Sequence, residues 1–281
     1  MRTKVILFGA GNVATHLGKA LHEAGHNIMQ VWSRNLLSAQ TLADRLGCQP
    51  HTFDEVSATT DTGTATCSIN ATTDYAGSKV KEDDCLVCII SVKDDAIEEV
   101  ARRMMPHFPK AIWAHTAGSV SIDTLTGKGA NRVGVFYPMQ TFSKDKEVDF
   151  KKISIFIEGT DCISELKALA QSISPKVYEL DGKGRRYLHL AAVFCCNFVN
   201  HCYTLGETVL RDADIPFDVM LPLIDETADK VHHLLPQQAQ TGPAARHDKG
   251  IMASQHDILE TDSTMQKIYD LMSESIEKST Q

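Results

Sequence analysis

The sequence has no apolar run of about 18 residues, the minimum length for a helix that crosses a bilayer. It also has no cluster of lysine and arginine, and its formal net charge is −8. Proteins that bind nucleic acid non-specifically neutralise phosphates with such clusters. We therefore expect neither a membrane partner nor a nucleic-acid partner.

We also expect no cleavable signal peptide, because Met1-Arg2-Thr3-Lys4 leads directly into a β-strand pattern. The eight cysteines are scattered and lie mostly in apolar runs, so they do not suggest a disulfide framework. Both features favour a cytoplasmic protein with free thiols.

The composition is that of a globular protein: the chain has 281 residues, 43% of them hydrophobic and 23% charged, which is enough for two domains. Short apolar runs predict strands at residues 4–8, 27–32, 85–92, 111–115, 132–136, 153–157 and 176–180. Helical periodicity lies between them at residues 12–24, 36–46, 96–105 and 163–172. This alternation predicts an α/β fold, a doubly wound and mostly parallel Rossmann sheet.

Two stretches depart from that alternation. Residues 57–81 are polar and rich in Thr, Ser, Asp and Gly, so we expect a mobile connection holding a short strand or two. From residue 185 onward the pattern is almost purely helical, with predicted helices at 185–210, 217–235, 253–259 and 265–276. We therefore predict a Rossmann dinucleotide-binding domain at 1–182 and an all-helical substrate and dimerisation domain at 183–281.

A dinucleotide motif lies between the first strand and the first helix. It is Gly9-Ala10-Gly11-Asn12-Val13-Ala14, which fits G-x-G-x-x-G/A. The first glycine permits a tight turn, the second lets a diphosphate approach the backbone, and Ala14 allows close helix packing. The helix N-terminus then binds the diphosphate through its free N–H groups. The alternative is a glycine turn that serves packing only.

The second predicted strand ends in Ser33-Arg34, where an NAD enzyme would carry Asp or Glu for the ribose hydroxyls. Arg34 can form charge-assisted hydrogen bonds with a 2′-phosphate, which predicts a preference for NADP over NAD. The alternative is a solvated arginine at the start of a loop.

Two apparent metal motifs are rejected. His22-Glu23-Ala24-Gly25-His26 matches H-E-x-x-H, but Gly25 ends the helix that both histidines would need to share. Cys85 and Cys88 have C-x-x-C spacing within a strand, so their side chains point to opposite faces. We predict no metal site.

Six segments together resemble one family, the bacterial Rossmann-like NADP oxidoreductases whose helical C-terminal half is a domain of unknown function. The segments are 9–14, 91–94, 115–119, 136–142, 189–197 and 241–248. The most specific pieces are His115-Thr-Ala-Gly118 and Gly242-Pro-Ala-Ala-Arg246. The resemblance implies kinship with pyrroline-5-carboxylate reductase, ketopantoate reductase and deazaflavin-dependent NADP oxidoreductases, and hence hydride transfer.

Three positions depart from what the resemblance implies. Tyr137 stands where His commonly precedes the proline, and His247 stands where Gly commonly separates Arg246 from Asp248. Related β-hydroxyacid dehydrogenases use a helix lysine four residues before an asparagine, but here Val193 occupies that place. The lysine mechanism is therefore not supported.

In a doubly wound sheet the ligand lies beyond the carboxyl ends of the strands at the switch point, so residues 91–94 and 115–119 should face nicotinamide and ribose. The predicted cofactor-binding residues are Gly9, Ala10, Gly11, Asn12, Val13, Ser33, Arg34, Ser91, Val92 and Thr116.

His115 is the leading candidate for the proton donor that carbonyl or imine reduction needs, or else it caps the loop after its strand. His189 and Asn197 lie eight residues apart on the long helix, hence on roughly one face, and could bound a substrate pocket. The alternative for His189 is a buried histidine that satisfies a backbone carbonyl.

Two further residues are predicted to bind substrate. Arg246 could hold a substrate carboxylate, or could pair with Asp248 to fix its own loop, and Ser119 belongs to the segment after the predicted strand at 111–115.

These observations predict an NADP-dependent oxidoreductase that acts on a small carbonyl or imine substrate, with Arg34 selecting the cofactor and His115 or His189 placing the proton. The candidate catalytic residues are His115, His189 and Asn197. The chain is expected to be a homodimer through its helical domain, as the resemblance implies and as the length of the apolar helix suggests. The rival is an NADP-binding sensor or scaffold without turnover.

Overall fold

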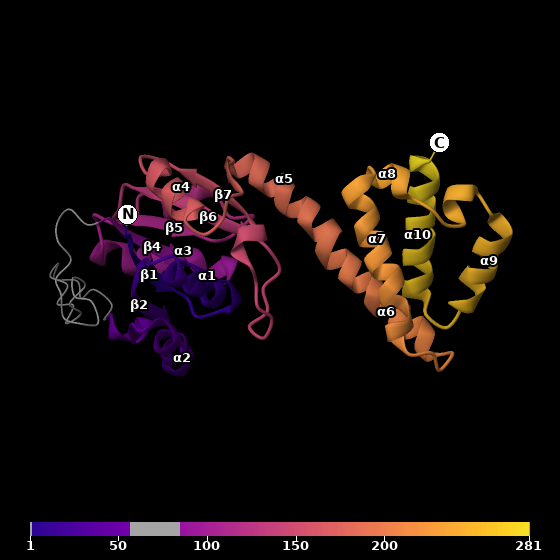
Figure 1. Ribbon diagram of the computed structural model, residues 1–281, viewed down its shortest axis with the longest axis horizontal. Helices are drawn as coiled ribbons and strands as arrows, with labels where there is room; N and C mark the ends of the chain where they lie inside the picture. Colours follow the sequence, from indigo (N-terminus) through magenta and orange to yellow (C-terminus); the bar gives the residue numbers. More distant parts are fainter. Residues whose placement is uncertain (1, 57–84, 281) are drawn as a thin grey trace. The chain divides into compact units, whose positions relative to one another are not determined.

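The eight-stranded sheet of the N-terminal part has the order β3-β2-β1-β4-β5-β6-β7-β8 in the computed structural model, which describes residues 2–56 and 85–280 (Figure 1). The strands are β1 (Lys4–Phe8), β2 (Asn27–Ser33), β3 (Gln49–Thr52), β4 (Leu86–Ile90), β5 (Ile112–His115), β6 (Val133–Met139), β7 (Ser154–Gly159) and β8 (Val177–Glu179). Strands β1 to β6 pair in parallel, β7 is antiparallel to β6, and β8 is parallel to β7. The expected doubly wound, mostly parallel sheet is confirmed.

Helices cover both faces of this sheet. Apolar side chains of α1 (Asn12–Glu23), α2 (Leu36–Leu46) and α4 (Ile163–Gln171) pack in one core cluster, and those of α3 (Ile97–Met104) pack in the other. The central strands β1 and β4 therefore have almost no exposed side chain, as continuous apolar runs predict. The chain moves from β1 outward to β3 and then returns to β4, which places the topological switch point between β1 and β4.

The sequence patterns did not predict strand β3, and they did not predict that β7 runs antiparallel to β6. Strand β3 reads Gln-Pro-His-Thr and has no apolar alternation, and it forms at the edge of the sheet, where proline is tolerated. The reversal at β7 follows from the loop after β6, which returns without a crossover helix. The polar connection expected at residues 57–81 lies outside the described residues.

The C-terminal part is helical, as predicted. Its elements are a π-helical turn (Val193–Phe198), α6 (Val199–Arg211), α7 (Leu221–His233), α8 (Pro236–Ala239), α9 (Lys249–Ile258) and α10 (Ser263–Ser279). Of residues 194–280 only Ala244, Met265 and Ser273 are buried. This unit thus leaves most of its apolar side chains exposed. No helix in the described part of the chain is long and apolar enough to cross a membrane.

The chain divides into two compact units, Met1–Val193 and Phe194–Gln281. Residue 182, the last residue of the predicted Rossmann domain, is the first residue of α5 (Gly182–Ala192). Helix α5 belongs with the sheet because its Arg185 bonds to β7 and to the loop after β5.

Candidate cofactor and reaction site

The turn between β1 and α1 is shaped by glycine. Gly9 has φ +129°, and a Cβ placed there would lie 2.1 Å from the carbonyl oxygen of Ser91. Only glycine therefore allows β1 and β4 to approach in this way. A Cβ on Gly11, by contrast, would meet no atom within 4 Å, so the backbone at Gly11 faces open space.

The first backbone N–H groups of α1 have no side-chain cap to accept their hydrogen bonds. Gly11 is the N-cap and provides no side-chain bond, and the first turn contains no acidic residue. The first intrahelical bond runs from Thr15 N to Gly11 O at 3.0 Å, which leaves the preceding N–H groups directed outward. Such a terminus binds diphosphates. The open space at Gly11 and these donors fit a dinucleotide.

A cavity of about 920 Å³ lies over this turn. The structure brings to it all ten residues predicted to bind the cofactor: Gly9, Ala10, Gly11, Asn12, Val13, Ser33, Arg34, Ser91, Val92 and Thr116. At its floor the Thr116 hydroxyl donates to Ser91 Oγ at 3.3 Å, joining the ends of β4 and β5.

The lining of the cavity includes three basic and three acidic side chains. Arg34 is exposed, and its side chain has no hydrogen-bond or ion-pair partner among the described residues. Arg103 of α3 also lines the cavity and donates to the carbonyl of Val56 at 3.0 Å. Arg103 was not predicted from the sequence, because only the folded sheet brings α3 to the same cavity as the end of β2.

His115 lies at the end of β5 and is fully buried. Its Nδ1 accepts from the Ala117 N–H at 3.2 Å, and its Nε2 has no partner among the described residues. Burial, followed by the charge of Arg185, lowers the pKa of His115 to about 4. The ring is therefore neutral at pH 7, with its proton on Nε2. It does not line the cofactor cavity, so its role as a proton donor stays a prediction.

His189 of α5 meets Tyr137 of β6. The Tyr137 hydroxyl lies 3.3 Å from His189 Nδ1, and both side chains are half-buried. A Cβ on Gly118 would lie 2.7 Å from His189 Nδ1 and 2.8 Å from Tyr137 Cζ, so the pair packs directly on this glycine. Thr116 and Ala117, just before Gly118, line the cofactor cavity. The pair therefore lies beside that cavity.

An acidic side chain stands next to this pair. Ser119 donates to Asp94 Oδ2 at 3.1 Å, across the ends of β4 and β5. Burial raises the pKa of Tyr137, the Asp94 carboxylate raises it further, and Arg185 opposes them. Tyr137 therefore keeps its proton at neutral pH. Tyr137 stands out in the sequence as a departure from the usual histidine, but its spacing from His189 does not predict their contact.

The C-terminal unit carries the other two predicted residues. Arg246 is exposed and has no ion pair with Asp248 or any other described residue, while Asp248 instead caps α9 by accepting from Ile251 N at 3.2 Å. Asn197 is exposed within the π-helical turn, so the α-helical spacing that related it to His189 does not hold between them.

The departure at His247 has a local explanation. His247 adopts a left-handed conformation with φ +55°, which glycine provides without strain. Its ring pairs with Glu277 of α10 at 3.6 Å, and Lys249 pairs with the same carboxylate. These contacts hold a non-glycine residue in this conformation.

Neither rejected metal motif gains support. His26 Nδ1 accepts from Thr3 N at 3.1 Å, and its Nε2 lies 2.8 Å from Ser172 Oγ, so both ring nitrogens have protein partners. In the described residues no three His, Cys, Asp or Glu side chains group to hold a metal ion.

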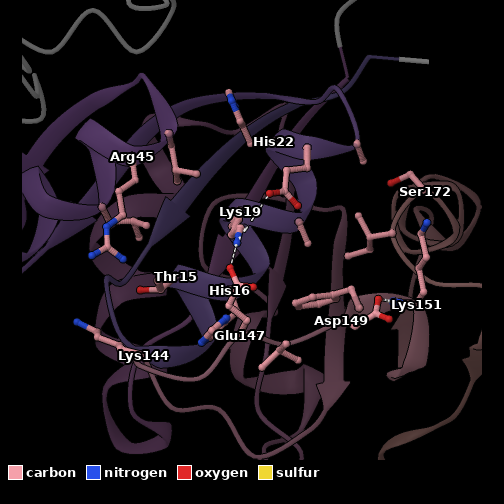
Figure 2. A pocket seen from close by; sticks show the side chains of 18 of the residues that line it. Thr15, His16, Lys19, His22, Arg45, Lys144, Glu147, Asp149, Lys151 and Ser172 are labelled. Atoms are coloured by element: carbon pink, nitrogen blue, oxygen red, sulfur yellow. Dashed lines mark hydrogen bonds and ion pairs between the residues drawn. The ribbon is translucent and has the colours of Figure 1, made fainter.

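A second cavity, of about 910 Å³, lies between α1, α2 and the loop after β6 (Figure 2). In Figure 2 a dashed line joins Lys19 to Glu147, two of the residues that line this cavity. The distance from Lys19 Nζ to Glu147 Oε1 is 2.8 Å. The cavity is lined by four Lys or Arg and four Asp or Glu side chains, so its charge is balanced. This cavity therefore has no evident charge preference for a ligand.

The same loop is tied to the cofactor turn. Asn12 Nδ2 donates to the Phe142 carbonyl at 2.7 Å, and His16 Nε2 lies 2.8 Å from the Ser143 carbonyl. The His16 and Phe142 rings stack at 5.5 Å. One face of α1 thus holds the β6–β7 loop.

Two family models match the chain. Residues 4–112 match the model described as NADP oxidoreductase coenzyme F420-dependent, and residues 153–276 match a domain of unknown function, DUF2520. No curated protein matches the chain.

Solved structures give a fuller comparison. A presumed NADP oxidoreductase from Bacteroides fragilis is 42% identical, with 99% of this chain and 98% of that chain covered and a TM-score of 0.83. A reductive aminase from Aspergillus terreus, in complex with NADPH, is 16% identical over 99% and 94% with a TM-score of 0.61. A 1-pyrroline-5-carboxylate reductase from Streptococcus pyogenes is 14% identical over 99% and 98% with a TM-score of 0.58.

The last two share the fold alone with this chain, whereas the Bacteroides protein is similar enough to share its family. The chain belongs to the Rossmann-like NADP oxidoreductases whose C-terminal part is DUF2520, and NADP is the cofactor of this family.

Proposed function

We propose that the protein transfers hydride between NADP(H) and a small carbonyl or imine substrate. The observation that carries this proposal is the hydrogen-bonded Tyr137–His189 pair packed on Gly118, beside the cavity that fits the dinucleotide. The names of the fold neighbours, a reductive aminase and a pyrroline carboxylate reductase, agree with a C=N or C=O acceptor.

The chain's own groups divide the binding work. The free N–H groups of α1 hold the diphosphate, and Arg34 holds the 2′-phosphate because its guanidinium is exposed and unpaired in the described residues. When bound, NADPH supplies the hydride. Ser91, Val92 and Thr116 lie at the ends of β4 and β5 and orient the nicotinamide side.

Hydride addition to a carbonyl or imine leaves a basic oxygen or nitrogen that must be protonated. Tyr137 donates the one proton that the product needs, because its raised pKa keeps its hydroxyl protonated, and His189, which contacts that hydroxyl, provides the route by which the Tyr137 oxygen regains a proton from solvent. His115, being buried and neutral, supports the loop that carries Gly118 by accepting from Ala117 N–H.

We also propose that the protein is a homodimer and that its C-terminal unit forms the dimer interface. Its exposed apolar side chains include Phe194 at 61%, Phe198 at 50% and Leu235 at 67%. Such exposure is costly in water and supports association with a second copy. Sedimentation should give a dimer at micromolar concentration, and replacing Phe194 and Phe198 with serine should weaken it. A monomeric wild-type protein would contradict the dimer.

Within the assembled protein, Ser119, Asn197 and Arg246 are our candidates for substrate contacts. Arg246 is free of Asp248 and can take a substrate carboxylate in bidentate fashion. All seven described cysteines are free, which supports a reducing compartment such as the cytoplasm.

Oxidation of NADPH across a panel of keto acids, aldehydes and cyclic imines tests the function. We expect saturable turnover that falls by roughly 10² to 10⁴ in Tyr137→Phe and in His189→Gln. Tyr187→Phe is the matched control, since Tyr187 is 69% exposed. Tight NADPH binding with no turnover on any substrate would contradict the proposal and favour an NADP-binding sensor or scaffold.

A further inference from the structure

Arg185 is a buried charge in the first half of α5. Only 1% of it is exposed, although α5 begins at the surface and its neighbour Arg186 is exposed. Burial of a guanidinium is unfavourable unless its donors are well satisfied. The hydrogen bonds that Arg185 makes must therefore offset the free-energy cost of burying its charge.

The guanidinium joins three segments that are distant in sequence. Its Nη1 donates to Glu158 of β7, and its Nη2 donates to the carbonyl of Val120 at 2.6 Å. The other oxygen of Glu158 accepts from Gly182 N, the first residue of α5, at 3.2 Å. Strand β7, the loop after β5 and the start of α5 are thus fixed to one another.

Two of the segments that Arg185 joins, helix α5 and the loop after β5, also contact or carry the Tyr137–His189 pair. His189 lies four residues after Arg185, so it stands on the same face of α5, one turn further along. Gly118 lies two residues before Val120 and touches both His189 and Tyr137. Arg185 therefore holds the helix that carries His189 and the loop that carries Gly118.

Two buried donors remain without partners here in the described part of the chain, Nε of Arg185 and Nε2 of His115. The charge of Arg185 also lowers the pKa of Tyr137, against the larger effect of burial. A lysine could reproduce the charge but not the two-directional fork, because an ammonium lacks the planar geometry.

We propose that Arg185 is a positioning residue: its guanidinium fork sets the contact between Tyr137 and His189, and lysine cannot replace it. The proposal rests on the proposed function for its catalytic meaning, since that pair is our proton donor. Its structural content, however, can be measured without any substrate.

The experiment compares full-length Arg185→Met, Arg185→Lys and the exposed control Arg186→Met. The measurement is the ring ¹⁵N shifts of His189 by NMR, with Tyr137→Phe giving the values expected when the hydrogen bond is lost. We expect both Arg185 variants to show the Tyr137→Phe values and Arg186→Met to show the wild-type values. NADPH affinity should change less than about threefold, because Arg185 itself does not line the cofactor cavity. Should Arg185→Met not fold, Arg185→Lys carries the test alone.

Wild-type His189 shifts in Arg185→Lys would overturn the proposal, because charge alone would then suffice. Equal losses in Arg186→Met, or identical shifts in wild type and Tyr137→Phe, would overturn it as well. With an active substrate, turnover should fall about 100-fold in Arg185→Lys. If no substrate turns over, the proposed function fails while the NMR result still decides the role of Arg185.

Discussion

The two ends of the candidate site are built in different ways. The cofactor end is made of backbone from one short turn, Gly9 to Val13, and of the helix that follows it. The reaction end is made of the side chains of Asp94, Tyr137 and His189 and the backbone of Gly118, which four separate segments supply. The first end depends on glycine where the backbone must approach, and the second depends on how the rest of the fold places each side chain.

The largest expected effect would break the cofactor end at its backbone. Gly9→Ala places a methyl group 2.1 Å from Ser91 O at φ +129°, and backbone atoms cannot move aside. Strain and overpacking together should cost about 3 to 5 kcal/mol of unfolding free energy. Denaturant titration measures it. Gly11→Ala, with open space around its Cβ, should lose NADPH affinity while its stability changes by less than about 1 kcal/mol.

A second prediction concerns the buried histidine of the reaction end. The pKa of His115 falls from 6.5 to about 4 on folding, so its neutral form stabilises the protein fully above pH 6.5. That contribution is lost as the pH falls from 6.5 to about 4 and amounts to about 3 kcal/mol. His115→Asn keeps an acceptor for Ala117 N–H and should flatten the pH dependence of the unfolding free energy. The exposed His22→Gln should leave it unchanged, and an unchanged curve in His115→Asn would contradict the buried, neutral ring.

The third prediction concerns the side chain at the cofactor end that we expect to distinguish NADPH from NADH. Arg34→Ala should weaken NADPH binding by roughly tenfold or more, since a charge-assisted bond contributes about 1.5 to 3 kcal/mol. Binding of NADH should not change. Fluorescence titration with both cofactors measures the ratio, and equal losses for the two would contradict the assignment of Arg34 to the 2′-phosphate.

The last prediction concerns a glycine of the reaction end, where the expected change in stability is smaller than at Gly9. Gly118→Ala puts a methyl group against His189 and Tyr137, whose side chains can shift, so the cost should be only about 1 to 2 kcal/mol. Turnover should nevertheless fall about 100-fold, because the donor pair moves. A variant with full activity would show that the pair does not need this contact.

Sequence patterns predicted the strand, glycine turn and helix at the cofactor end because these elements are adjacent in the chain. A strand, a glycine turn and an amphipathic helix in sequence already define it, and the central strands are apolar throughout. Periodicity could not find β3, whose Gln-Pro-His-Thr sequence has no apolar pattern and forms by pairing with β2.

The reaction end could not be assembled from sequence for a different reason. Tyr137 and His189 are 52 residues apart, and Arg185 and Val120 are 65 apart, so their contacts depend on the packing of α5 against the sheet. The spacing of His189 and Asn197 assumed an uninterrupted α-helix, and the π-helical turn at Val193–Phe198 removes that assumption.

Asn12 belongs to two structures at once. It lines the dinucleotide cavity, and its amide also secures the carbonyl of Phe142 in the β6–β7 connection. A substitution there loosens a surface segment as well as a nucleotide contact. Its effect on NADPH affinity therefore measures the sum of both losses, and His16→Ala, which releases the same segment through Ser143 from outside the cavity, supplies the amount to subtract.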